Sequence, residues 1–215
     1  MSFVIKKDPT KVQINATGQG WEHSPIQTDH IVYALNDYVR IEKYGIKPDI
    51  LFMMDLLSEK PQIVSGHDDL GEIISRINKF GVLFVGPYKY AEIPLSVAFP
   101  LEQCVKEFGL PYFTNTICYM IAYALLNGAK EISIYGVNQA GSQEYVEEKG
   151  GVEYWLGVAN GRGVKVLING KHSQLLRYKG RYGRDILYGY LQSLEEIIDS
   201  NHKFGEGTIY KLTAP

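Results

Sequence analysis

A glycine-rich segment, INATGQGWEHS at residues 14–24, follows the first apolar run of the chain. Gly18 and Gly20 flank Gln19 directly after the alternating run at residues 11–16. Glycine has no side chain, so the backbone of such a turn can approach a phosphate closely and donate N–H groups to it. An ordinary turn uses the same residues. The segment therefore indicates either a phosphate-binding loop or a simple turn.

Polar residues also follow the other apolar runs that resemble strands. Asn36 follows residues 31–35, and Asp55 follows residues 49–54. Gly136 and Asn138 follow the later run at residues 132–135. An amide side chain both donates and accepts hydrogen bonds, as recognition of a nucleotide base or ribose requires. The alternative that these residues only form turns stays open.

The elements that position these residues alternate along the chain, which indicates an α/β fold. Short apolar runs predict strands at residues 11–16, 31–35, 49–54, 82–85, 132–135 and 164–168. Helical spacing predicts helices at residues 37–44, 68–81, 114–127, 152–160 and 185–200. We therefore expect one Rossmann-like domain over residues 1–215, with a mostly parallel twisted sheet of about six strands and helices on both faces. Ligands of such sheets bind at the carboxyl ends of the strands.

Composition excludes several broad classes of protein. The chain has 215 residues and a net charge of −2, so bulk charge does not favour a nucleic-acid partner. No apolar stretch reaches the roughly 18 residues of a membrane span, and the amino terminus has no signal-peptide pattern. Cys104 and Cys118 lie in apolar runs, which predicts buried free thiols and a reducing compartment. We therefore expect a cytoplasmic protein.

Absent motifs narrow the chemistry further. The dinucleotide fingerprint G-x-G-x-x-G is incomplete, because His23 stands where its third glycine belongs. The chain has no P-loop and no Asp-x-Asp pair, which disfavours P-loop ATPases and the metal-dependent transferases that use that pair. His67, Asp68 and Asp69 are interpreted as a helix start with Asp caps rather than a metal site.

The order of four segments resembles a known family. ATGQGWEHS resembles its glycine loop, with Trp21-Glu22 in place of Pro-Ser, and VYALNDYVRIEKYGIKPDILFMMD resembles its strand-Asn-helix-strand segment. FTNTICYMIAYALLNGAKEISIYGVN is similar to its Thr-Ser-Gly-x-Tyr-Met helix and the strand that follows, and NGKHSQLL to its Asn-Ser-Leu-Leu segment. The family is that of bacterial lipooligosaccharide sialyltransferases and related Rossmann-like proteins, which include archaeal 6-hydroxymethylpterin diphosphokinases. GGVEYWLGVANGRGVKV also resembles a segment of short phage-encoded relatives.

The resemblance implies a nucleotide-activated donor, such as a cytidine-monophosphate sugar. Asn36 matches the family's Asn, and Asp55 stands where the family has Asn; Asn115 and Thr116 match its Thr-Ser pair, Asn138 its Asp and Ser173 its Ser. Thr116 begins a predicted helix, where a hydroxyl both caps and contacts phosphate. The predicted nucleotide-binding residues are Gly18, Gln19, Gly20, Asn36, Asp55, Asn115, Thr116, Gly136, Asn138 and Ser173.

The predicted catalytic residues are less well matched. Tyr145 is our candidate for stabilising the departing phosphate without a metal. The sialyltransferases use a histidine base before the next strand, but residues 146–163 contain none. A glutamate of that segment (147, 148 or 153) is one replacement, and His172 is another. Glu147, Glu153 and His172 stay in competition.

Three functions follow as hypotheses. The first is a glycosyltransferase that uses a nucleotide sugar and requires no cofactor or metal. The second is an ATP- and Mg²⁺-dependent diphosphotransferase of the pterin kinase type, with Asp55 facing the metal. The third is a nucleotide-binding protein without activity. The acceptor, the donor's base and sugar, and the oligomeric state stay open, with a homo-oligomer as one alternative.

Overall fold

The computed structural model describes residues 6–18, 21, 24–25, 28–36, 47–55, 57, 70–139, 143–169 and 173–176. The chain divides into two units, Met1–Leu175 and Leu176–Pro215, and every element below belongs to the first. The single domain over residues 1–215 stays a prediction. The helices expected at 37–44 and 185–200 lie outside the described residues. Within the described ranges, no helix combines the length and the apolar character needed to cross a membrane.

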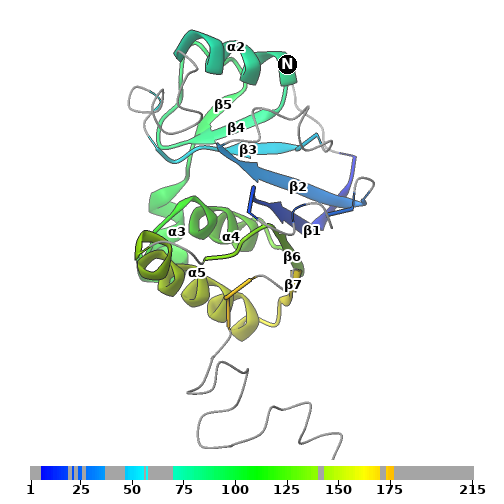
Figure 1. The fold of residues 1–215 in the computed structure, drawn as a ribbon, viewed down its shortest axis with the longest axis vertical. Helices are drawn as coiled ribbons and strands as arrows, with labels where there is room; N and C mark the ends of the chain where they lie inside the picture. The colour runs from blue at the N-terminus through cyan, green and yellow to red at the C-terminus, as the bar shows by residue number, and fades with distance from the viewer. Residues whose placement is uncertain are drawn as a thin grey trace, which may run out of the picture. The chain divides into compact units, whose positions relative to one another are not determined.

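A single sheet of seven strands organises the described chain (Figure 1). Its order is β5-β4-β3-β2-β1-β6-β7, and every neighbouring pair is parallel, which confirms the predicted α/β class. The chain builds outward from β1 in both directions, so β1 and β6 flank the topological switch point. The strands are β1 (Asp8–Asn15), β2 (His30–Leu35), β3 (Ile50–Phe52), β4 (Leu83–Gly86), β5 (Ser96–Ala98), β6 (Glu131–Tyr135) and β7 (Lys165–Asn169).

Helices cover both faces of this sheet, as predicted. The four described helices are α2 (Leu70–Phe80), α3 (Leu101–Phe108), α4 (Thr116–Leu126) and α5 (Gln143–Gly161). Ile73 and Ile77 of α2 belong to one buried cluster, while α3, α4 and α5 contribute to another, and Figure 1 shows these three gathered apart from α2. The two buried clusters explain why β3 is a continuous apolar run. Its residues alternate between the two clusters, as expected of a strand covered on both faces.

Tyrosine and cysteine side chains fill part of the core on the α4 side. The ring of Tyr33 lies 5.1 Å from that of Phe52 and 6.0 Å from that of Tyr123, measured between centroids. Burial raises the pKa of Tyr33, so its hydroxyl stays neutral. Cys104 and Cys118 are buried and free, which confirms the sequence prediction. Several of the many tyrosines therefore serve as core residues.

Two elements differ from the sequence prediction. The edge strand β5, between Pro94 and Pro100, and the helix α3 after it were not expected. The strand has only three residues, too few to show a periodicity. Helix α3 has eight residues with an apolar face, which the sequence prediction missed. Helix α5 begins at Gln143 rather than at residue 152. The glycine pair before residue 152 is not a helix end: a Cβ on Gly151 would lie 2.1 Å from Oγ1 of Thr114, so the glycine permits close packing inside the helix.

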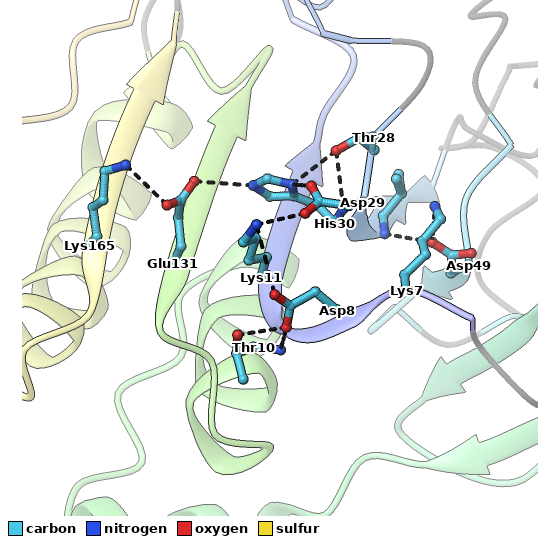
Figure 2. A network of polar contacts seen from close by, with 11 residues as sticks. Lys7, Asp8, Thr10, Lys11, Thr28, Asp29, His30, Asp49, Glu131 and Lys165 are labelled. Atoms are coloured by element: carbon cyan, nitrogen blue, oxygen red, sulfur yellow. Dashed lines mark hydrogen bonds and ion pairs between the residues drawn. The ribbon is translucent and has the colours of Figure 1, made fainter.

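A network of charged residues ties the amino ends of the strands together, at the edge opposite the strand ends considered above (Figure 2). Glu131 at the start of β6 contacts Nζ of Lys165 at 3.1 Å and Nε2 of His30 at 3.2 Å. The hydrogen bonds from Lys165 and His30 lower the pKa of the Glu131 carboxyl. Since β1 lies between β2 and β6, the His30 contact spans the central strand. Glu131 and His30 are partly buried and Lys165 is exposed, so the Lys165 pair adds little stability.

We predict that Trp155 anchors α5 against the segment before α4. Its indole is fully buried, donates to the carbonyl oxygen of Tyr112 at 2.7 Å, and stacks on Phe113 at a centroid distance of 4.9 Å. Trp155→Ala should lower the free energy of unfolding by about 3–5 kcal/mol in urea denaturation, because it leaves a large cavity. Trp155→Phe keeps most of the ring and should cost less. A loss below about 1 kcal/mol for the alanine variant would contradict this role.

Candidate functional site

A cleft of about 460 Å³ lies at the carboxyl ends of the strands that flank the switch point. This volume falls in the roughly 300–1,000 Å³ range of small-molecule sites. The segments after β1, β2, β3 and β6 line it, together with the amino-terminal turns of α4 and α5. The described lining consists of Ala16, Thr17, Gly18, Leu35, Asn36, Asp55, Thr114, Asn115, Thr116, Ile117, Gly136, Val137, Asn138, Gln139, Glu144, Tyr145 and Glu148.

The cleft brings together most of the predicted site residues that the structure describes. Those that line it are Gly18, Asn36, Asp55, Asn115, Thr116, Gly136, Asn138 and Tyr145. Glu147, Glu153 and Ser173 are not among its described lining residues. Glu147 accepts a hydrogen bond from Gln143, Glu153 pairs with Lys149, and Ser173 is buried. Gln19, Gly20 and His172 lie outside the described residues.

Gly18 and Gly136 let the loops after β1 and β6 meet at the floor of the cleft. The N–H of Gly18 donates to the carbonyl oxygen of Gly136 at 2.9 Å. A Cβ on Gly18 would lie 2.4 Å from that oxygen, and a Cβ on Gly136, whose φ is +68°, would lie 2.4 Å from the carbonyl oxygen of Ala16. Gly18 is therefore required for backbone packing. Its contact with a phosphate stays a prediction.

The amino-terminal turn of α4 lines the cleft, and Asn115 caps it. Oδ1 of Asn115 accepts hydrogen bonds from the N–H groups of Ile117 at 3.1 Å and Cys118 at 3.2 Å. The sequence assigned capping to Thr116, but Thr116 is the first helical residue. The cap is one residue earlier because Asn115 has the extended backbone that a cap requires. The helix dipole makes this end of the cleft favourable for an anion.

Glu148 is a cleft residue that the sequence did not separate from its neighbours. Nδ2 of Asn115 donates to Oε2 of Glu148 at 3.1 Å, which fixes the carboxylate beside the α4 cap. Burial raises the pKa of Glu148, and the charges of Glu144 and Asp55 raise it further, against the lowering effect of the Asn115 hydrogen bond. Glu144 and Glu148 can be predicted to share a helix face only if the helix is known to start at Gln143, before both residues. The helix predicted from the sequence began at residue 152, after both glutamates, so it could not show that they share a face.

Two residues of the cleft with amide side chains have a backbone in the left-handed region, and their side-chain oxygens lack a hydrogen-bond donor among the described residues. Asn36 has a φ of +39° and Gln139 a φ of +49°. Oδ1 of Asn36 and Oε1 of Gln139 are buried and accept no hydrogen bond from the described protein. A non-glycine residue in this conformation and a buried unpaired acceptor each cost free energy, and such costs concentrate at ligand sites. The sequence pointed to the strand end that holds Gln139, but not to Gln139 itself.

The carboxylates of the cleft are the side chains that a metal ion would need as ligands. Asp55 accepts a long hydrogen bond from Nδ2 of Asn36 at 3.5 Å. In the part of the chain that is described, no three His, Cys, Asp or Glu side chains converge as metal ligands would. The strongest anion-binding feature of the cleft is thus the start of α4, and its carboxylates lie on α5 and after β3.

Comparison with known proteins identifies solved structures with a similar fold. No family model and no curated protein matches this chain. The sialyltransferase CstII from Campylobacter jejuni in complex with the substrate analogue CMP-3FNeuAc aligns with a TM-score of 0.52 and 16% sequence identity, over 77% of this chain and 83% of that chain. Its structure with cytidine-5'-monophosphate aligns with a TM-score of 0.53 and 16% identity, over 77% and 81%. At this identity the likeness concerns the fold, which is sialyltransferase-like.

We predict that Gly18→Ala destabilises the protein whether or not a ligand is present. The added Cβ must displace the backbone of Gly136, which should cost about 2 kcal/mol or more in chemical denaturation. Gly157→Ala is the matched control. It lies inside α5 with nothing within 4 Å of an added Cβ, so it should stabilise by about 0.5–1 kcal/mol. Equal stability of the two variants would show that the loops do not meet as described.

Proposed function

We propose that this protein is a glycosyltransferase that takes its sugar from a nucleotide and uses no bound metal. The observation that carries the proposal is the composition of one cleft. It combines a helix amino terminus for a phosphate, amide groups for a nucleoside and a carboxylate with a raised pKa for proton transfer. A fold similar to that of CstII, whose structures hold cytidine-5'-monophosphate and CMP-3FNeuAc, supports a cytidine nucleotide as the first ligand to test.

In the proposed mechanism, some residues of the cleft bind the nucleotide and others catalyse transfer of the sugar. In our proposal the start of α4 and the loop at Gly18 bind the phosphate, while Asn36 and Asn138 hold the nucleoside. Glu148 accepts the proton of the acceptor hydroxyl as that oxygen bonds to the anomeric carbon. The bond between that carbon and the phosphate oxygen breaks, and its electron pair leaves with the nucleotide. Tyr145 donates a hydrogen bond to the charge that develops there.

Glu148 is a better candidate base than its rivals because of its surroundings. It lines the cleft, Asn115 orients its carboxylate, and burial raises its pKa toward the range where a base works near neutral pH. Glu153 pairs with Lys149 at 3.3 Å, and Glu147 accepts from Gln143. His172 stays an alternative from the sequence.

We predict that Glu148→Gln abolishes transfer but not nucleotide binding. Cytidine-5'-monophosphate should raise the melting temperature of the wild type and the variant alike. Turnover of a nucleotide sugar should fall about 10²–10⁴-fold, the usual contribution of a general base. A base acts in its charged form, so wild-type kcat should decline as the pH falls through a pKa above 4.5, and the variant should lack this decline.

The neighbouring residue provides a matched control for this experiment. Glu147→Gln removes the same charge from the same helix turn, on a side chain that does not line the described cleft. It should leave turnover close to that of the wild type. If Glu147→Gln is the inactive variant, the assignment of the base is wrong.

We predict that Tyr145→Phe slows donor cleavage without weakening donor binding. Tyr145 lines the cleft from the first turn of α5, and its side chain is partly exposed. Loss of one donor to a developing charge typically costs roughly 10²–10³ in rate. The expected pattern is a lower kcat with little change in donor affinity, measured by single-turnover kinetics and calorimetry. A change in affinity alone would make Tyr145 a binding residue only.

Asp55 favours the diphosphotransferase as a second candidate function. It lines the cleft, and its charge adds to the raised pKa of Glu148, so two carboxylates lie close enough to interact. Activity that requires Mg²⁺ and ATP, is lost with a chelator and is lost again in Asp55→Asn would favour this alternative. Binding of a nucleotide sugar without turnover under any condition would favour the non-enzymatic binding protein.

A further inference from the structure

The carboxylates of the cleft are concentrated on one helix. Glu144 and Glu148 are four residues apart on α5, so they share a helix face, and both line the cleft. No lysine, arginine or histidine is among the described lining residues. Like charges at this spacing weaken a helix, so the pair carries a cost in the free protein. The α5 side of the cleft therefore has a negative potential, while the start of α4 has the opposite character.

Two neutral amide oxygens of the same cleft lack a hydrogen-bond donor among the described residues. Gln139 is only 7% exposed, and its Oε1 has no partner among the residues described. Asn36 adds a second buried, unpaired oxygen. Both residues hold left-handed backbones, which also costs free energy. A ligand that donates hydrogens to these oxygens would recover part of the cost, whereas a carboxylate has no hydrogen to donate at neutral pH.

We propose that the nucleotide sugar bound in this cleft has a sugar without a carboxylate, either a neutral polyhydroxy sugar or an amino sugar. This inference rests on the proposed function and specifies its donor. The phosphate lies toward the start of α4, and the sugar lies toward Glu144 and Glu148. Its hydroxyl or ammonium groups donate to Oε1 of Gln139, while Oδ1 of Asn36 accepts from the nucleoside of the same ligand. A carboxylate on the sugar at this position has no hydrogen to donate to Gln139 and meets the like charges of Glu144 and Glu148.

Two matched pairs of ligands test the sign of this selectivity. CMP-sialic acid and the methyl ester of its sialic acid differ in one carboxylate. UDP-glucuronic acid and UDP-glucose also differ at one carboxylate and share a different base. Calorimetry on the full chain at low salt should give at least one pair that binds, with the neutral member roughly tenfold tighter, as expected for one unscreened like-charge contact at the cleft.

Charge-removing variants identify the residues responsible. Glu144→Gln should reduce the preference for the neutral member to about threefold or less, because half of the carboxylate pair is gone. Glu102→Gln on α3 is the control. It removes one carboxylate from an exposed position that does not line the described cleft, so it should leave the preference unchanged.

The outcomes separate this inference from the proposed function. If an acidic member binds as tightly as its neutral partner or more tightly, the inference is wrong while nucleotide-sugar binding stands. An equal loss of preference in Glu102→Gln would also overturn it, since the effect would then be one of net charge. If none of the four ligands binds, the proposed function fails and the inference fails with it.

Discussion

The close approach of two backbone loops at the switch point determines the rest of the cleft. Gly18 and Gly136 meet through a 2.9 Å hydrogen bond, and neither position has room for a Cβ. This contact closes the floor between β1 and β6 and directs Asn138 toward Gly18. Every other group of the cleft is arranged around that floor. Gly18 and Gly136 thus have a structural role that does not depend on a ligand.

A second close contact sets the wall of the cleft. Gly151 lets α5 pack against Thr114, whose hydroxyl donates to the carbonyl oxygen of Glu148 at 2.7 Å. The same junction places the Glu148 carboxylate beside the Asn115 amide. One side chain therefore caps α4 and orients the candidate base on α5. A change in the packing of the two helices would therefore alter the cap of α4 and the position of the Glu148 carboxylate together.

The two edges of the sheet serve different purposes. At the amino ends of the strands, charged side chains such as Glu131 find partners on other strands of the sheet (Figure 2). At the carboxyl ends, the side-chain oxygens of Asn36 and Gln139 find no partner among the described residues, and Glu144 and Glu148 line the same cleft. Satisfied groups fix the sheet, and unsatisfied groups retain free energy that a ligand can recover. This asymmetry is the physical basis for assigning function to one edge only.

The sequence by itself determined the class of fold and indicated the strand ends that supply several of the cleft residues. Strands and helices could be predicted because both depend on the local spacing of apolar residues. Parallel strands bring their carboxyl ends to one edge of the sheet, so Asn36 and Asn138 could be predicted to lie at the same edge. Only the tertiary structure decided where α5 starts. A Gly-Gly pair can end a helix or lie inside one, and the contact of Gly151 with Thr114, which shows that it lies inside, is not visible in the sequence. The tertiary structure also decided which acid faces the cleft, since Glu147 and Glu148 are adjacent in the chain but point to different partners. Burial, backbone strain and the charge of a neighbour arise from contacts between distant segments, and no local pattern encodes them.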